Sequence, residues 1–124
     1  MERVKEFHIA TDQPVGVEPN MADMLFRAAL IREESRELKQ ALHGVCHYPC
    51  GEDKKALAHL LKEMCDVIYV IKGTAVTFGW DLDEAYKRVC DNNMTKVTPY
   101  RKDPVTGKVL KPDNYKPVEL EDLV

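Results

Sequence analysis

Four carboxylates form two pairs of equal spacing in the central part of the chain. Glu34 and Glu37 lie in the stretch IREESREL, and Glu63 and Asp66 lie in LLKEMCDVIYV. Residues three positions apart in a helix project from one face, with Cβ atoms about 5–6 Å apart. At 100° per residue, Glu34 falls inside the apolar arc of its segment and Glu37 at the edge of that arc. In the second segment Glu63 and Asp66 flank Val70. The acids therefore point toward the core, where an unpaired charge is not tolerated.

Two explanations for these acids remain open on the sequence. Clustered carboxylates raise one another's pKa unless a cation holds them, and ligands that are all oxygen select a hard metal such as Mg²⁺ or Mn²⁺. Alternatively, the acids are solvated or form ion pairs with Arg27, Arg36 and Lys62. Because both pairs lie on mostly apolar faces, we favour the metal.

The charge of the chain is unevenly distributed. A length of 124 residues suits one domain, and the net charge of −3 argues against bulk binding to nucleic acid. Residues 96–116 nevertheless carry six basic residues against two acidic ones, so the rest of the chain is strongly acidic. A basic tail beside an acidic body suits an anionic ligand bound between them, although a tail that is merely solvated is the alternative.

Cysteine content and hydropathy indicate a cytoplasmic protein. The N-terminal stretch MERVKEFHIATD lacks the charged-then-apolar pattern of a signal peptide, and we expect the four cysteines to be reduced. The longest apolar stretch, 67–78, is interrupted by Lys72 and Gly73 and is too short to span a bilayer. We therefore expect no membrane partner.

Helical periodicity and capping signals predict the first two helices. Residues 1–10 suit a short helix, and residues 11–19 read as a loop with two prolines and a glycine. Asn20 is an N-cap candidate, and apolar residues then recur at helical spacing over 21–42. Gly44 supplies a stop signal.

Two further helices are predicted over 54–78 and from Leu82 to about Val97. Gly79 ends the first of these, and Asp81 with Glu84 resembles a capping box for the second. After Asp66 the longer helix is apolar on almost every side, so it must be covered on every side. A single chain of this size hardly offers that cover. We therefore predict an all-α fold, a helical bundle completed by oligomerisation as a dimer or tetramer.

The segment between the second and third helices carries residue types that bind zinc. His43, Cys46, His47 and Cys50 lie in one short stretch. No second cluster completes a known zinc pattern, so an ordinary turn is the favoured interpretation and structural zinc the alternative.

Beyond Val97 the chain is rich in proline and reads as an extended basic arm over about 98–124. PVTG followed by KVL suits a tight turn with short flanking strands. We predict a single domain over 1–124, with a helical core at about 20–97.

The motifs together resemble a known group of enzymes. EExxE (Glu33, Glu34, Glu37) followed by ExxD (Glu63, Asp66) is similar to the all-α nucleotide pyrophosphohydrolases, which include MazG-like enzymes, dimeric dUTPases and phosphoribosyl-ATP pyrophosphohydrolases. The stretches NNMTK at 92–96 and TGKVLKPDNYKP at 106–117 resemble the ending of small MazG-like proteins. No histidine follows Asn93, which argues against a role in histidine biosynthesis.

The resemblance implies a role for each matching residue. It makes Glu34, Glu37, Glu63 and Asp66 the Mg²⁺ ligands, and Glu33 a further ligand or a group that positions the attacking water. It makes Glu33 and Glu34 the catalytic pair, and the substrate-binding residues Asn93, Lys96, Lys111 and Tyr115.

The implied reaction is attack of water at the α-phosphorus of a nucleoside triphosphate or deoxynucleoside triphosphate, which yields the monophosphate and pyrophosphate. This displacement needs neutralised phosphate charge, a positioned water and a stabilised leaving group. A di-iron carboxylate bundle is disfavoured because Glu34 is followed by Glu37, not histidine, at i+3. A non-catalytic helical module that binds metal or nucleotide is the remaining alternative.

Overall fold

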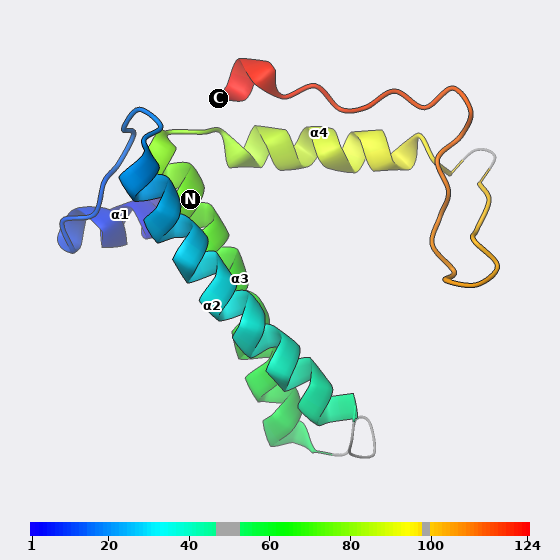
Figure 1. Cartoon of the computed structure of the whole chain (residues 1–124), viewed down its shortest axis with the longest axis horizontal. Helices are drawn as coiled ribbons and strands as arrows, with labels where there is room; N and C mark the ends of the chain where they lie inside the picture. The colour runs from blue at the N-terminus through cyan, green and yellow to red at the C-terminus, as the bar shows by residue number, and fades with distance from the viewer. Residues whose placement is uncertain (47–52, 98–99) are drawn as a thin grey trace. The chain divides into compact units, whose positions relative to one another are not determined.

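The computed structural model describes residues 1–46, 53–97 and 100–124. Its elements are α1 (Glu2–Ala10), α2 (Met21–Cys46), α3 (Lys54–Phe78), α4 (Leu82–Met94) and a short 3₁₀ helix η1 (Glu121–Leu123) (Figure 1). The described residues contain no strand, so the all-α prediction is confirmed. The chain divides into two units, residues 1–80 and residues 81–124.

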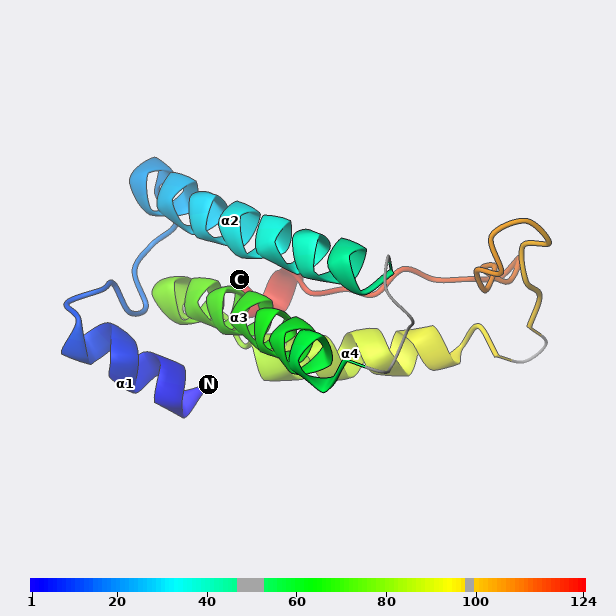
Figure 2. The ribbon, with the colours of Figure 1, turned by 90° about the horizontal axis from the view of Figure 1, so that it is seen from below.

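The first unit is built on an antiparallel helix pair. α2 and α3 run side by side along most of their length (Figures 1 and 2), and α1 packs against α3. The buried apolar side chains come mainly from the C-terminal half of α3, with one each from α1 and α2: Val4, Ala41, Val70, Ala75, Val76 and Phe78. The half of the pair that includes the acidic residues therefore has a smaller apolar core.

Local signals fix both ends of α3 as predicted. The Asp53 carboxylate accepts hydrogen bonds from the backbone N–H groups of Lys55 at 3.0 Å and Ala56 at 3.2 Å, which caps the first turn. At the other end, Gly79 adopts a left-handed conformation with φ of 72°, which favours glycine.

The start of α2 is as predicted, but its end is not. Asn20 Oδ1 accepts a hydrogen bond from the Asp23 backbone N–H at 2.9 Å, as an N-cap does. The predicted stop at Gly44 is wrong, because α2 continues through it to Cys46. A glycine inside a helix costs only about 1 kcal/mol relative to alanine, a cost small enough for a helix with a buried residue such as Ala41 to continue through it.

A buried arginine joins α2 to α3. The Arg27 guanidinium donates to the Val70 carbonyl at 2.8 Å and to the Thr74 hydroxyl at 3.2 Å, and burial lowers the pKa of this group. A Cβ atom on Gly73 would overlap the guanidinium, so glycine is needed there for the close approach. Arg27 is therefore engaged by the backbone of α3, which removes it from the predicted ion-pair partners of the acids.

The loop between α1 and α2 is tied to the end of α3. The backbone N–H groups of Gly16 and Val17 donate to the carbonyls of Val76 at 3.0 Å and Thr77 at 2.8 Å. His8, which is buried, donates from Nδ1 to the Pro14 carbonyl at 3.1 Å. These bonds hold the N-terminal segment on the helix pair.

The second unit begins with α4. The Asp81 carboxylate accepts from the Glu84 backbone N–H at 3.0 Å, and the helix ends at Met94, three residues before the predicted Val97. Arg88 on α4 forms a two-pronged ion pair with Asp122 of η1, at 2.7 and 2.9 Å. The last residues of the arm are thereby bound to α4.

The predicted turn in the arm is present, but its strands are reduced to one bridge. Asp103 accepts from the backbone N–H groups of Val105 and Thr106, and Gly107 has φ of 72°. A single antiparallel bridge joins Lys102 and Val109.

An apolar stripe on α3 is exposed in the single chain. Leu61, Met64, Ile68 and Ile71 are spaced 3, 4 and 3 residues apart and are 62, 47, 52 and 40% exposed. This is the spacing by which one helix packs along another. We propose that the stripe is the contact between subunits of a homo-oligomer. The sequence predicts this contact for 67–78, but Val70 and residues 75–78 are buried within the chain, so the proposed surface lies further toward the start of α3.

Replacing Ile68 with lysine tests the predicted oligomer. We expect Ile68→Lys to sediment as a smaller species than the wild type and to retain its helical circular dichroism, because the side chain is exposed within one chain. Val70 would be a poor choice, since its side chain is buried within the chain and a lysine there would place an unpaired charge in the core. A wild-type protein that sediments as a monomer would contradict the prediction.

Candidate active site

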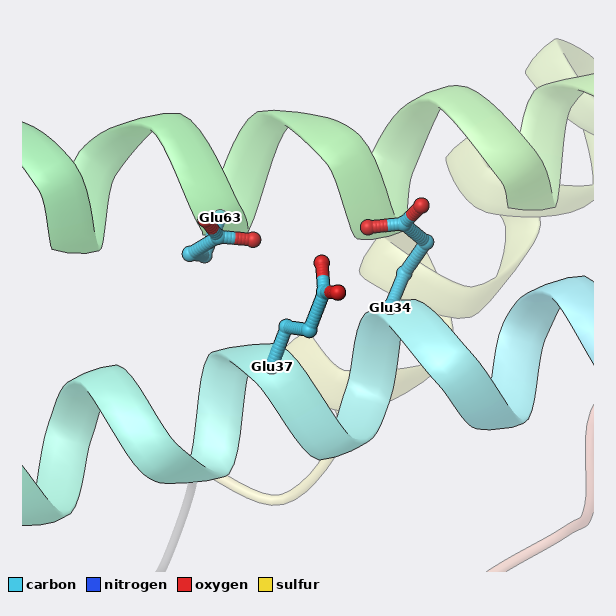
Figure 3. Close-up of side chains that lie close together, drawn as sticks. All are labelled: Glu34, Glu37 and Glu63. Carbon is cyan, nitrogen blue, oxygen red and sulfur yellow. The ribbon is translucent and has the colours of Figure 1, made fainter.

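Three glutamates from the two long helices meet between them. Glu34 and Glu37 project from α2 toward α3, and Glu63 projects from α3 toward α2 (Figure 3). One carboxylate oxygen of each lies within 4.8 Å of one from each of the others. Antiparallel pairing thus brings the two predicted acidic motifs together.

Two of these carboxylates have a buried oxygen without a partner. Glu63 is only 3% exposed, and its Oε2 has no hydrogen-bond partner among the described residues. Glu34 Oε2 is likewise buried and unpartnered. Buried polar atoms are normally paired, because an unpaired one loses its hydration without compensation. The residues present therefore fit a cation held between the helices.

The electrostatics of Glu34 agree with a crowded acidic site. Burial raises the pKa of its carboxyl, and the charges of Glu37, Asp66 and Glu33 raise it further. A bound cation would reverse this trend, since it stabilises the ionised form.

Asp66 stands apart from the three glutamates. Its Oδ2 lies 2.6 Å from Lys62 Nζ, whereas the Glu63 Oε1 lies 3.3 Å from the same ammonium. The hydrogen bond to Asp66, followed by that to Glu63, raises the pKa of Lys62, which stays charged. Of the three predicted ion-pair partners, Lys62 therefore does contact the acids. Glu33 is exposed beside the cluster on α2.

A cavity of about 780 Å³ adjoins the acidic cluster in the first unit. Glu37 and Glu63 lie in its wall, together with Lys62, His59 and Gln40. This volume is within the range of small-molecule sites. The site thus has room for a nucleotide-sized ligand beside the acids.

His59 and Gln40 were not predicted as site residues. His59 Nδ1 lies 3.5 Å from Glu63 Oε1, one helical turn away on α3. His59 lies four residues before Glu63, and Gln40 lies three residues after Glu37 on α2. This spacing places each on the same helix face as its acid, and it was the signal in the sequence that could have identified them.

The predicted substrate-binding residues gather in the second unit. Lys96 Nζ donates to Asn93 Oδ1 at 2.7 Å. The ammonium groups of Lys96 and Lys111 lie 5.5 and 5.0 Å from the centre of the Tyr115 ring. Cation–π attraction therefore groups two lysines around one aromatic ring.

The predicted zinc ligands are only partly described. His43 and Cys46 lie in the last turn of α2, whereas His47 and Cys50 fall outside the described residues. Within the described ranges, three or more metal-binding side chains lie close together only at the three glutamates.

Comparison with protein families identifies the chain. The family model described as phosphoribosyl-ATP pyrophosphohydrolase matches residues 4–93. The chain belongs to this family. It is therefore an enzyme, a hydrolase of phosphoanhydride bonds that acts on a nucleotide, and the resemblance to the all-α pyrophosphohydrolases is confirmed. A search of curated proteins finds no match.

The family match covers the acidic cluster but ends at Asn93. Lys96, Lys111 and Tyr115 lie beyond it. Among the helices of the described residues, none is long and apolar enough to cross a bilayer.

Replacing Glu34 with glutamine should stabilise the metal-free protein at pH 7. Glu34 has a higher pKa in the folded state than in the unfolded chain. The wild type therefore loses stability as the pH rises from the unfolded-state pKa through the folded-state pKa. Glutamine avoids this loss. We expect Glu34→Gln to gain of order 1 kcal/mol in urea unfolding with a chelator present, after allowance for solvent screening.

This gain should shrink as pH falls below the raised pKa of Glu34, because the wild-type carboxyl then becomes neutral. Glu18→Gln, in the exposed loop before α2, is the control and should change little. A loss of stability in Glu34→Gln at pH 7 would show that the carboxylate is paired in the fold.

Proposed function

We propose that this enzyme is a Mg²⁺-dependent nucleoside triphosphate pyrophosphohydrolase that releases the monophosphate and pyrophosphate. The supporting observation is the pair of buried, unpartnered oxygens on Glu34 and Glu63, which come from different helices and face one cluster. Buried oxygens without a partner destabilise the fold, and a ligand that binds them removes this cost.

Glu34, Glu37 and Glu63 are the proposed metal ligands, with Asp66 as the fourth. All the donor atoms are carboxylate oxygens, which favours Mg²⁺, with Mn²⁺ as a substitute. When bound, the ion supplies neutralisation of phosphate charge and a lowered pKa for a bound water. Glu33 is exposed next to Glu34, so its carboxylate can orient the attacking water by hydrogen bonding.

The basic group on the second unit is proposed to bind the substrate. Lys96 and Lys111 are held near one ring, and two ammonium groups so placed suit the outer phosphates of a triphosphate. Asn93 positions Lys96 through its side-chain oxygen. We propose that these residues bind the outer phosphates and that water attacks the α-phosphorus.

The family model is described as phosphoribosyl-ATP pyrophosphohydrolase, and phosphoribosyl-ATP carries the same α–β phosphoanhydride. The absence of histidine after Asn93 leads us to favour an ordinary NTP or dNTP as substrate. A screen of the common NTPs and dNTPs together with phosphoribosyl-ATP, coupled to pyrophosphatase, separates these substrates.

Hydrolysis in ¹⁸O-labelled water tests the bond that breaks. We expect one labelled oxygen in the monophosphate, because attack is at the α-phosphorus, and none in pyrophosphate. Turnover should stop with EDTA and return with Mg²⁺ or Mn²⁺.

Glu63→Gln should lower kcat at least about 100-fold with the helical circular dichroism retained, whereas Glu18→Gln should be unaffected. Label in pyrophosphate or orthophosphate would contradict the proposed reaction. Full turnover by the Glu63 variant would remove that residue from the site.

A further inference from the structure

Lys62 lies among the proposed metal ligands, and its ammonium group forms ion pairs with two of them. Its ammonium is 2.6 Å from Asp66 Oδ2 and 3.3 Å from Glu63 Oε1. No other lysine or arginine in the described residues has a recorded ion pair with the four acids. Lys62 is therefore the resident counter-ion of the cluster.

This arrangement opposes metal binding at Asp66 and Glu63. A divalent ion bound to Asp66 and Glu63 would lie within a few ångströms of the ammonium, and like charges at that separation repel. The pairing also accounts for Asp66 standing apart from the three glutamates, since its carboxylate is directed to Lys62. Lys62 occupies one oxygen of each of these two acids, so metal binding there is favoured when its ammonium moves away.

The Lys62 side chain has space to move into the cavity beside the acids. The side chain is 61% exposed, and the residue lines the same cavity as Glu37 and Glu63. A lysine stem has four methylene groups and carries its charge at the tip, so the ammonium can move while the backbone stays fixed. Once released, it faces a cavity that would receive an anionic substrate.

We propose that Lys62 is a displaceable counter-ion: divalent metal releases its ammonium from Asp66 and Glu63 into the adjoining cavity, where it binds substrate phosphate. The inference rests on the proposed function, because it needs a metal at the acids and a phosphate ligand beside them. It assigns Lys62 two opposite effects, competition with the metal and attraction for the substrate.

Lys62→Met tests both effects, since methionine keeps much of the length of the side chain without the charge. Mn²⁺ affinity of the full chain is measured by calorimetry, followed by the affinity of methylenediphosphonate, a stable pyrophosphate analogue, at saturating Mg²⁺. We expect Lys62→Met to bind Mn²⁺ about threefold to tenfold more tightly, because no ion pair has to be broken. We expect the analogue to bind about tenfold more weakly.

Two control variants separate this role from a general change in charge. Lys55→Met removes the same charge from α3 two turns earlier and should alter neither affinity more than about twofold. Lys62→Arg keeps the charge and should restore an Mn²⁺ affinity close to that of the wild type.

The outcomes distinguish this inference from the proposed function. If the wild type binds Mn²⁺ but Lys62→Met leaves both affinities unchanged, or moves them in the same direction, the role of Lys62 is overturned and the metal site stands. If neither the wild type nor Lys62→Met binds Mn²⁺, the proposed function fails and this inference fails with it.

Discussion

The constraint on this structure is a pair of buried carboxylate oxygens, one on each of two paired helices, that have no hydrogen-bond partner among the described residues. Glu34 on α2 and Glu63 on α3 each contribute one such atom, with Glu37 close to both. In the absence of a cation these groups disfavour close approach of the helices. The pair must therefore be held by contacts elsewhere, so that the acids stay together before any ligand binds.

Those contacts lie mainly toward the other end of the pair. Arg27 links α2 to the backbone of α3, and Gly73 leaves the space that its guanidinium fills. The loop at 11–19 bonds to the last turn of α3, whose apolar side chains form most of the core. Separation of the stabilising contacts from the acidic cluster is how a fold can tolerate a strained functional site.

Much of the first unit was predictable from local chemistry, and its errors have physical causes. Periodicity and the Gly79 stop located α3, whereas the Asp53 cap was seen only in the structure. Gly44 was misleading because helix propensity is a weak local term that packing overrides. Spacing placed the four acids on facing sides, but it could not show that Lys62 binds Asp66 more closely than it binds Glu63, since that depends on rotamers.

The second unit was harder to predict from the residues alone. Lys96 and Lys111 are far apart in the sequence, and no periodicity relates them to Tyr115. Their grouping arises from the way the arm turns at Asp103 and Gly107 and binds α4 through Arg88. Only the resemblance of the ending to small MazG-like proteins suggested that these residues act together, and the family match stops before them.

The central claim is that the acidic cluster between α2 and α3 binds a divalent metal. Anomalous scattering from crystals grown with Mn²⁺ tests it most directly, because it locates the ion independently of activity. The account predicts a peak within coordination distance of carboxylate oxygens of Glu34, Glu37 and Glu63. The absence of a peak at this position, in crystals at a Mn²⁺ concentration that supports turnover, would contradict it.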